Sequence, residues 1–222
     1  ETRTSLAGLY VAGEDAGGAH GSNRLGGNGV ANSTVYGGIA GDVMAADAQK
    51  MSALHDPDET ILDEELARAI IPFSAKPGNV QELRVRLMDA MWDDVGVMRD
   101  AAGLKLGIEK IASLKTDMEN VGVSGDNLAF NLSWHDWLSL QSLIDTSEVI
   151  AKAGLSRENS RGAHFREDFP DAGSLDDSYF TIATSGDKGI EVNREAVKFT
   201  IVKPGESLLG ADEAETLVEA AQ

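Results

Sequence analysis

Three amphipathic stretches dominate the hydrophobic pattern in the middle of the chain. In each of them apolar residues recur every three or four positions, the spacing that gathers side chains on one face of a helix. The first stretch starts after Asn79, an N-cap candidate with Glu82 as its capping partner, and is expected to end near Arg99. The third ends near Leu155, and the short connections between the stretches predict an antiparallel three-helix bundle. The apolar positions are Val80, Leu83, Leu87, Met91, Val95 and Met98, then Leu104, Ile108, Ile111, Leu114 and Met118, then Trp137, Leu140, Ile144 and Ile150.

The pattern differs on either side of this bundle. Residues 30–54 are mostly small and predict one helix, and the linker after them contains a shorter helix at Ile61–Ile71. Near the start, Leu9–Ala12 is a short apolar run typical of a buried strand. Tyr179–Thr184 and Gly189–Asn193 flank a Ser-Gly-Asp-Lys-Gly turn and predict a β-hairpin.

Two further elements are expected at the C-terminal end. Val197–Val202 alternates between apolar and polar residues and predicts a third strand, stopped by Pro204-Gly205. The acidic tail Ala211–Gln222 predicts a short helix. The sequence therefore predicts an α+β fold in several parts, with a small β-rich end.

Composition narrows the classes of partner. The 222 residues include 19 Lys and Arg against 37 Asp and Glu, for a formal net charge of −18. Nucleic acids and anionic membranes attract clustered positive charge, so neither is an expected partner. The sequence has no cysteine, so disulfides and thiolate clusters are excluded, and no metal site is predicted. No run of about 18 apolar residues is present, so no membrane span is predicted.

A glycine-rich loop connects the first apolar run to the helix predicted from residue 30. Such a loop is either a flexible surface segment or a cradle for an anion, because glycines allow the main chain to approach a ligand closely. Arg24 is the cationic residue of this loop, and His20 precedes it by four positions. A guanidinium can grip a carboxylate with two parallel hydrogen bonds. A helix start adds unpaired N–H groups and a partial positive charge, which favours the second interpretation.

The residues of this loop resemble a known family signature. Gly13-Glu14 followed by His20–Asn28, HGSNRLGGN, is similar to GE…HGANRLGGNSL, which lies near the C-terminal edge of the flavin domain in the flavoprotein subunit of succinate dehydrogenase and fumarate reductase. L-aspartate oxidase is a close relative of that family. Residues 91–100, MWDDVGVMRD, resemble its MWdxVGIxR helix, and residues 160–170, SRGAHFREDFP, resemble its ESRGAHxREDxP segment. The resemblance covers residues 1 to about 170.

The resemblance assigns roles to residues of the loop. Arg24 would bind a carboxylate of the C4 dicarboxylate substrate and act as the catalytic arginine of this chain, with His20 beside it in substrate binding. Glu14 would contact the ribityl chain of FAD. The helix start at Asn28, Gly29 and Val30 would face the pyrimidine edge of the flavin.

The signature departs from the family at two places. Gly29-Val30 stands where the family has Ser-Leu, and Ser22 stands where it usually has Ala. A serine hydroxyl contact to the flavin is therefore not expected at position 29, whereas backbone N–H contacts remain possible.

The resemblance also implies parts that this sequence lacks. No strand–GxGxxG–helix unit with a following acidic residue is present, although that unit seats a dinucleotide pyrophosphate. We therefore expect the chain to be the C-terminal portion of a larger FAD-dependent oxidoreductase, sharing FAD with an N-terminal half and inactive alone. An iron–sulfur subunit is a further expected partner. We expect the chain itself to lie in the cytoplasm or at the cytoplasmic face of a membrane complex. The rival hypothesis is a non-catalytic module that docks such an electron-transfer subunit.

Residues 160–170 admit two interpretations. Together with Arg157 and Glu158 just before them, they include three arginines, three acidic residues and a histidine, which is usual for a solvated charged surface. In the family this segment leads from the helical bundle back to the flavin domain. Arg161 and His164 would either line the outer shell of the carboxylate pocket or pair with acidic residues where the two parts meet.

Three other groups of residues carry ordinary structural predictions. Met88, Met91, Trp92 and Met98 are expected in the core. Trp134 and Trp137 are expected to anchor the third helix, with His135 and Asp136 in solvent between them or capping the helix. His55 is expected to be solvated.

The predicted organisation combines the motifs with the pattern. The α+β fold comprises the edge of an FAD-binding α/β domain, a linker, an antiparallel three-helix bundle and a small β-rich C-terminal domain. Their ranges are 1–54, 55–78, 79–160 and 161–222.

Overall fold

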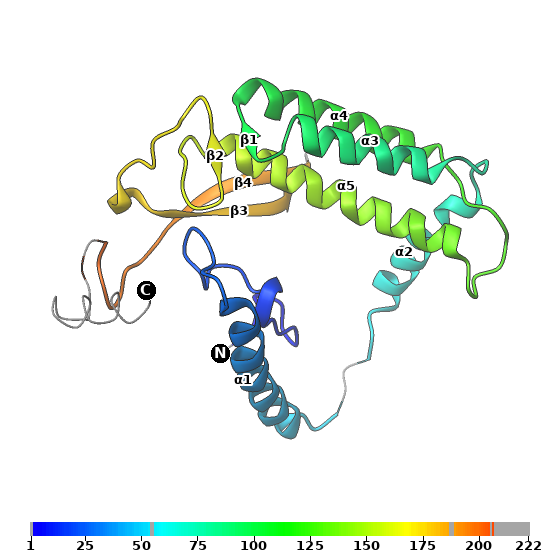
Figure 1. Cartoon of the computed structure of the whole chain (residues 1–222). Coiled ribbons are helices and arrows are strands. Elements are labelled where there is room, and N and C mark those ends of the chain that lie inside the picture. Colours follow the sequence, from blue (N-terminus) through cyan, green and yellow to red (C-terminus); the bar gives the residue numbers. More distant parts are fainter. Residues whose placement is uncertain (1, 54–55, 187–188, 205, 207–222) are drawn as a thin grey trace.

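The computed structural model describes residues 2–53, 56–186, 189–204 and 206, and it shows a mixed helical and β structure (Figure 1). The helices are α1 (Asn28–Lys50), α2 (Glu59–Ile70), α3 (Val80–Asp93), α4 (Ala101–Glu119) and α5 (Leu132–Ser156), with 3-10 turns η1 (Gly13–Asp15), η2 (Ile71–Phe73) and η3 (Leu175–Asp177). The strands are β1 (Met98–Arg99), β2 (Phe165–Arg166), β3 (Tyr179–Gly186) and β4 (Gly189–Ala196).

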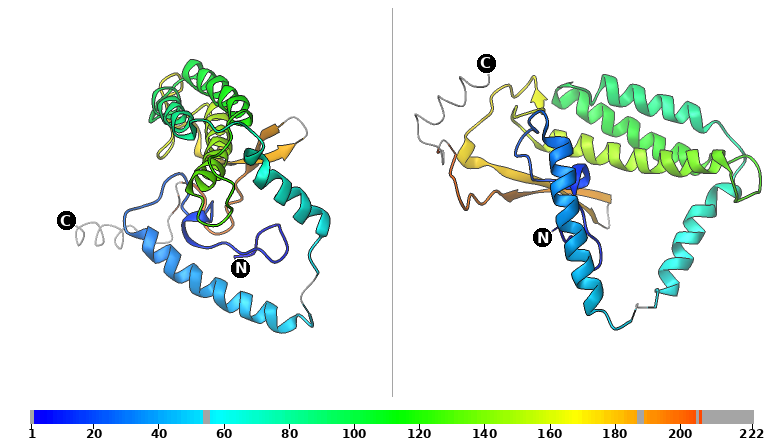
Figure 2. Two further views of the ribbon diagram at one scale, coloured as in Figure 1. Left: turned by 90° about the vertical axis from the view of Figure 1, so that its right-hand side faces the viewer. Right: turned by 60° about the horizontal axis from the view of Figure 1, so that its bottom comes forward.

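The predicted three-helix bundle is confirmed: α3, α4 and α5 lie side by side and run antiparallel in sequence order (Figures 1 and 2). Each helix starts at a side-chain cap that satisfies an unpaired N–H group of its first turn. Asn79 accepts from the Glu82 N–H at 3.1 Å, Asp100 from Gly103 at 2.7 Å, and Asn131 from Trp134 at 3.1 Å. The caps fix where each helix starts, and the apolar faces then meet.

The core of the structure lies inside this bundle. Its buried members come mainly from the apolar repeats, and they are Leu83, Leu87, Val95, Leu104, Ile111, Leu114, Met118, Val123, Trp137, Leu140, Ile144 and Ala151. The tryptophan prediction is confirmed, since Trp137 Nε1 donates to the Val121 carbonyl at 2.8 Å and Trp134 Nε1 to the Ala69 carbonyl at 2.7 Å. His135 and Asp136 are exposed between them.

Two expectations for α3, the first helix of the bundle, are wrong. It ends at Asp93 rather than near Arg99, and the chain then turns into the short strand β1. Met88 and Trp92 are 61% and 80% exposed, because Leu83, Leu87 and Ala90 form the face of α3 that meets the bundle. Met98 is also exposed, whereas Met91 packs against the core.

Two separate pairs of strands lie at one end of the bundle. β1 and β2 pair in parallel, and β3 and β4 form the predicted antiparallel hairpin in the register Tyr179↔Ala196 to Gly186↔Gly189. Residues 187–188 of the predicted turn lie outside the described residues.

The third strand predicted at Val197–Val202 does not form. The three residues between the two predicted strands, Arg194-Glu195-Ala196, include no turn residue and continue β4. The chain therefore runs on away from the hairpin instead of reversing beside it (Figure 1). The predicted tail helix at 211–222 and His55 lie outside the described residues.

The N-terminal segment forms a separate unit on α1, which stands apart from the bundle (Figure 2). The predicted helix 30–54 is found at Asn28–Lys50. Leu9–Ala12 is not a buried strand: among the described residues it pairs through one bridge, between Arg3 and Tyr10, and Leu9 is 52% exposed.

Asp47 of α1 binds the N-terminal segment at both residues of the Arg3–Tyr10 bridge. Its carboxylate accepts from the Tyr10 hydroxyl at 2.7 Å and from the Arg3 guanidinium at 3.0 and 3.1 Å. The hydrogen bond from Tyr10, followed by those from Lys50 and Arg3, lowers the pKa of Asp47 to about 2.

The shorter helix predicted in the linker is α2. It touches the bundle near its C-terminal end, where Arg68 donates to Gln141 at 2.6 Å. None of its residues is buried. Among the described helices, none combines the length and apolar character needed to cross a bilayer.

We predict strongly uneven protection from amide hydrogen exchange along this chain. Only Asn32 and Ala40 of α1 are buried, whereas α4 and α5 form the core, so α1 opens at a lower free-energy cost. Amides of α1 should exchange about 100-fold faster than those in the middle of α4, on the order of the difference between local and global opening. Slow exchange throughout α1, in a chain shown to be monomeric by light scattering, would contradict this.

Candidate functional site

A buried asparagine holds the glycine-rich loop to α1. Asn32 is 8% exposed; its Nδ2 donates to the Gly13 carbonyl at 3.2 Å and lies 3.2 Å from His20 Nε2. Because the amide nitrogen can only donate, His20 Nε2 accepts and the neutral ring carries its proton on Nδ1. One side chain therefore fixes both the Gly13-Glu14 pair and His20. Asn32 is not among the predicted site residues, because its polar type and helical position carry no distinguishing pattern.

Arg24 lies over the first turn of α1. A Cβ added at Gly29 would lie 2.6 Å from Arg24 Nη1, so the guanidinium occupies the space that a side chain at position 29 would need. Within the described part of the chain, Arg24 has no hydrogen-bond or ion-pair partner, and it is exposed. Arg24, which the sequence predicts to bind a carboxylate, is thus a cation without a partner in the described chain.

The start of α1 places a second positive feature beside this guanidinium. Its N-cap, Gly27, is in the left-handed region at φ 82° and provides no side-chain cap, and the first turn contains no acidic residue. Helix N-termini carry a partial positive charge, so Arg24 and α1 repel each other slightly unless an anion lies near both. Asn28 and Val30 are exposed at this helix start, and Glu14 is exposed on η1.

The glycine-rich loop meets the end of the bundle at two points. Gly18 lies against the Phe180 ring of β3, with 3.5 Å between a Cβ added at Gly18 and Phe180 Cε1. Gly162 lies against the backbone of Ser22 and the side chain of Asn23. These contacts connect the HGSNR and SRGAH motifs, which are distant in the sequence.

The two residues predicted at the outer shell of the pocket have structural partners. The Arg161 guanidinium donates to the Ala172 and Ser174 carbonyls and, at 3.0 Å, to Ser178 Oγ. His164 Nδ1 accepts from Arg99 at 3.0 Å, and its Nε2 donates to the Arg157 carbonyl at 3.1 Å. Both side chains therefore fasten the 160–178 segment to its surroundings. Among the described residues, neither pairs with an acidic side chain, so that interpretation is wrong, and neither has a hydrogen bond or ion pair to Arg24.

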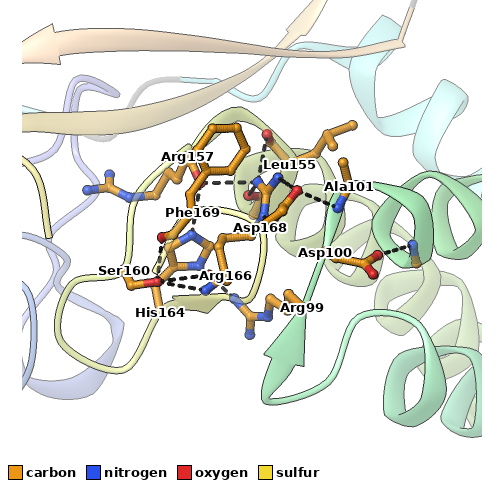
Figure 3. A network of polar contacts seen from close by, with 12 residues as sticks. Arg99, Asp100, Ala101, Leu155, Arg157, Ser160, His164, Arg166, Asp168 and Phe169 are labelled. Carbon is orange, nitrogen blue, oxygen red and sulfur yellow. Dashed lines mark hydrogen bonds and ion pairs between the residues drawn. The ribbon is translucent and has the colours of Figure 1, made fainter. Parts of the chain in front are cut away.

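Arg166 joins the ends of two helices (Figure 3). Its side chain is 1% exposed and forms two hydrogen bonds of 2.7 Å to the Asp168 carboxylate. Nη1 lies 3.1 to 3.2 Å from three carbonyl oxygens at the C-terminal end of α5, those of Gly154, Leu155 and Arg157. Asp168 Oδ2 in turn accepts from the Ala101 N–H at the start of α4 at 3.0 Å. The pair thus caps α5 with a cation and α4 with an anion, as the two helix dipoles favour.

The network shifts the titration of its members. The hydrogen bond from Arg166 is the main cause that lowers the pKa of Asp168 to about 2, and the Ala101 N–H adds to it. Burial, followed by the positive charges of Arg99, Arg157 and Arg166, lowers the pKa of His164 below its usual value of 6.5, against the opposing hydrogen bond to the Arg157 carbonyl. His164 is therefore neutral at pH 7.

Other features of the surface do not add to this site. A groove of 290 Å³ between α3 and α4 is lined by Arg86, Asp89 and Lys110 and contains none of the predicted site residues. Among the described residues, no group of three or more histidine, aspartate or glutamate side chains is arranged to hold a metal ion.

Comparison with known proteins supports the resemblance found in the sequence. A family model described as "Fumarate reductase flavoprotein C-term" matches residues 84–208. The CoM/CoB fumarate reductase of Methanothermobacter marburgensis has a polypeptide that is 36% identical over 171 residues, covering 76% of this chain and 30% of that polypeptide.

Solved structures share the fold. Sdh1 of Mycobacterium smegmatis, solved in complex with UQ1, matches with a TM-score of 0.78 and 30% identity over 95% of this chain and 35% of that chain. E. coli quinol fumarate reductase FrdA matches with a TM-score of 0.79 and 25% identity over 90% of this chain and 35% of that one. The chain spans about a third of the length of these relatives.

We predict that Arg166→Met destabilises the protein far more than the same change on the surface. The variant leaves the buried carbonyls at the end of α5 without their donor, which should lower the free energy of unfolding by about 2–4 kcal/mol. Arg86→Met is the matched control, because Arg86 forms an ion pair with Asp117 at a 45% exposed position and should change it by at most about 1 kcal/mol. Urea denaturation followed by circular dichroism measures both, and equal losses would contradict the capping role.

We also predict a contribution of His164 to the pH dependence of stability. The folded protein resists protonating His164, whereas the unfolded chain binds that proton below about pH 6.5. The contribution of neutral His164 to the free energy of unfolding is therefore fully present above pH 6.5, and it is lost as the pH drops towards the folded-state pKa. The melting temperature should fall less steeply between pH 7.5 and 5 for His164→Gln than for the parent protein. His135→Gln, at an exposed position, should leave the slope unchanged; identical slopes for all three proteins would refute the assignment.

Proposed function

This chain belongs to the succinate dehydrogenase and fumarate reductase flavoprotein family, and we propose that it supplies the substrate-carboxylate arginine and one edge of the flavin site to an enzyme that interconverts succinate and fumarate or a related C4 dicarboxylate pair. The observation that carries the proposal is the unpartnered Arg24 guanidinium beside the uncapped start of α1. An anionic substrate would turn this unfavourable pairing of positive features into a favourable one.

Each residue of the site has a defined task in this proposal. Arg24 binds one carboxylate of the substrate through its planar fork and holds the substrate in a fixed orientation. His20 lies beside it in the ring orientation set by Asn32, and its Nδ1–H remains available as a donor. Arg24 is the residue of this chain that we expect to contribute most to transition-state binding.

The residues present fit part of an FAD site. The first N–H groups of α1, at Gly29 and Val30, have no side-chain cap competing for them, and Glu14 is exposed on the neighbouring turn η1. When bound, FAD supplies the hydride-transfer chemistry of this family. In this chain Glu14 would hold the ribityl hydroxyls, and the α1 start would favour negative charge placed against it.

The remaining parts of the proposed enzyme lie on other segments or subunits. A nucleotide-binding half would complete the flavin site, and an iron–sulfur subunit would carry electrons to or from it. The E. coli relative is named a quinol fumarate reductase, which is consistent with an electron-carrying partner in that protein.

We predict that Arg24→Lys in the complete flavoprotein lowers kcat/KM for fumarate by about 100-fold. Lysine keeps the charge but loses the two-pronged geometry, so a strong transition-state contact disappears. Flavin content should stay unchanged, because Arg24 faces the substrate. Reduction of fumarate by reduced viologen measures the rate, and Arg86→Lys on the distant surface of α3 is the control. Near-native kinetics of Arg24→Lys would argue against catalysis at this site and favour a docking role.

A further inference from the structure

We propose that Gly162 is a positioning residue for Arg24, and that the turn from Arg161 to His164 is the surface against which the substrate loop is set. This inference rests on the proposed function of Arg24 and adds a residue from a segment far away in the sequence. Three observations support it: the turn is held firmly, the loop is held loosely, and the contact between them tolerates only glycine.

The turn is fastened from several directions. Arg161 and His164 form a bridge closed by the hydrogen bond from the His164 N–H to the Arg161 carbonyl at 3.0 Å. The Arg161 side chain binds the 172–178 segment, and His164 lies between Arg99 and the Arg157 carbonyl. Next in the chain, the buried Arg166 binds the end of α5. The turn therefore moves with the rigid end of the bundle.

The loop that carries Arg24 has fewer restraints. Residues 21–28 are all exposed, and the side-chain hydrogen bond that holds the loop to α1, between His20 and Asn32, lies before this segment. Ser22 and Asn23 directly precede Arg24, and their contact with Gly162 lies between that hydrogen bond and the arginine. The turn thus determines the position of the backbone immediately before Arg24.

The contact leaves no room for a side chain on Gly162. A Cβ at this position would overlap the Ser22 carbonyl oxygen and lie 3.0 Å from Asn23 Cβ. The clash is with backbone, so rotating a side chain cannot relieve it, and either the loop or the turn must move. Since the turn is the better-fastened partner, a substitution here should displace the loop and Arg24 with it. Gly162 also has φ +59°, a conformation that costs any other residue some strain.

A matched pair of glycines separates the two effects of substitution. Gly173 has φ +71° and, for an added Cβ, only the flexible Arg161 Nη2 at 3.6 Å. Gly162→Ala and Gly173→Ala therefore share the backbone strain, but only the first displaces the loop. In the complete flavoprotein, Gly162→Ala should raise KM for fumarate and the Kd for malonate, read from the flavin absorption change, by about 10-fold or more, as expected for an ångström-scale misplacement of a binding group. Gly173→Ala should change both by less than about twofold.

Combining variants tests whether the effect passes through Arg24. If it does, Gly162→Ala should add little to Arg24→Lys, because the contact it misplaces is already lost. Independent, additive losses would overturn the proposal. So would a Gly162→Ala protein that retains flavin and behaves like Gly173→Ala, while Arg24→Lys weakens malonate binding. If instead Arg24→Lys leaves malonate binding unchanged, the proposed function itself fails.

Arg161→Ala provides a second test if Gly162→Ala does not fold. This variant adds no atoms and loosens the turn by removing its side-chain bonds to the 172–178 segment. We expect a smaller rise in the Kd for malonate and faster hydrogen exchange at residues 20–25, with exchange in α4 unchanged. An unchanged Kd and unchanged exchange at 20–25 would overturn the positioning role.

Discussion

The structure depends on one buried guanidinium. Arg166 binds the carbonyls that end α5 and the carboxylate of Asp168, which in turn receives the first N–H of α4. A cation and an anion held together thereby satisfy two opposite helix ends, and the geometry sets how far apart those ends can lie. Everything at that end of the bundle, including the β1–β2 pair and the 161–164 turn, is built around this arrangement.

The same arrangement gives the charged 160–170 segment a structural role. His164 and Arg161 use their hydrogen-bonding capacity on carbonyls, Arg99 and Ser178, so they stiffen the turn. Arg24 is the opposite case, a guanidinium without a partner in the described chain, resting where Gly29 leaves space. Arg161 and His164 therefore belong to the scaffold, whereas Arg24 keeps its donors for the anion that the proposed function assigns to it.

Local patterns in the sequence predicted the bundle well, because apolar repeats and cap residues act within one helix. Leu83 and Leu87 of the buried face and the Asn79 cap follow directly from spacing, whereas Ala90 is not among the predicted apolar positions. The wrong predictions depend on partners far away in the chain: Val197–Val202 alternates like a strand but finds no edge to join, and Met88 and Trp92 face outward. For the site, the motif located Arg24, His20 and Glu14, and their roles stay predictions. The contact of Gly162 with Ser22 and the capping role of Arg166 arise only from the fold, since a run of charges has the same pattern whether it is solvated or buried.

The parallel pairing of β1 with β2 has a consequence for the order of assembly. The whole of α4 and α5 lies between these two strands, so the pairing closes a long loop and gains nothing until both helices have docked. We therefore expect the 161–164 turn, which contacts Ser22 and Asn23, to form among the last contacts during folding. Pulse-labelling exchange would contradict this order if residues 164–169 became protected before α5. With the expected order, anion binding at Arg24 would require that the helices have docked. A chain with undocked helices would lack the 161–164 turn that is proposed to position Arg24.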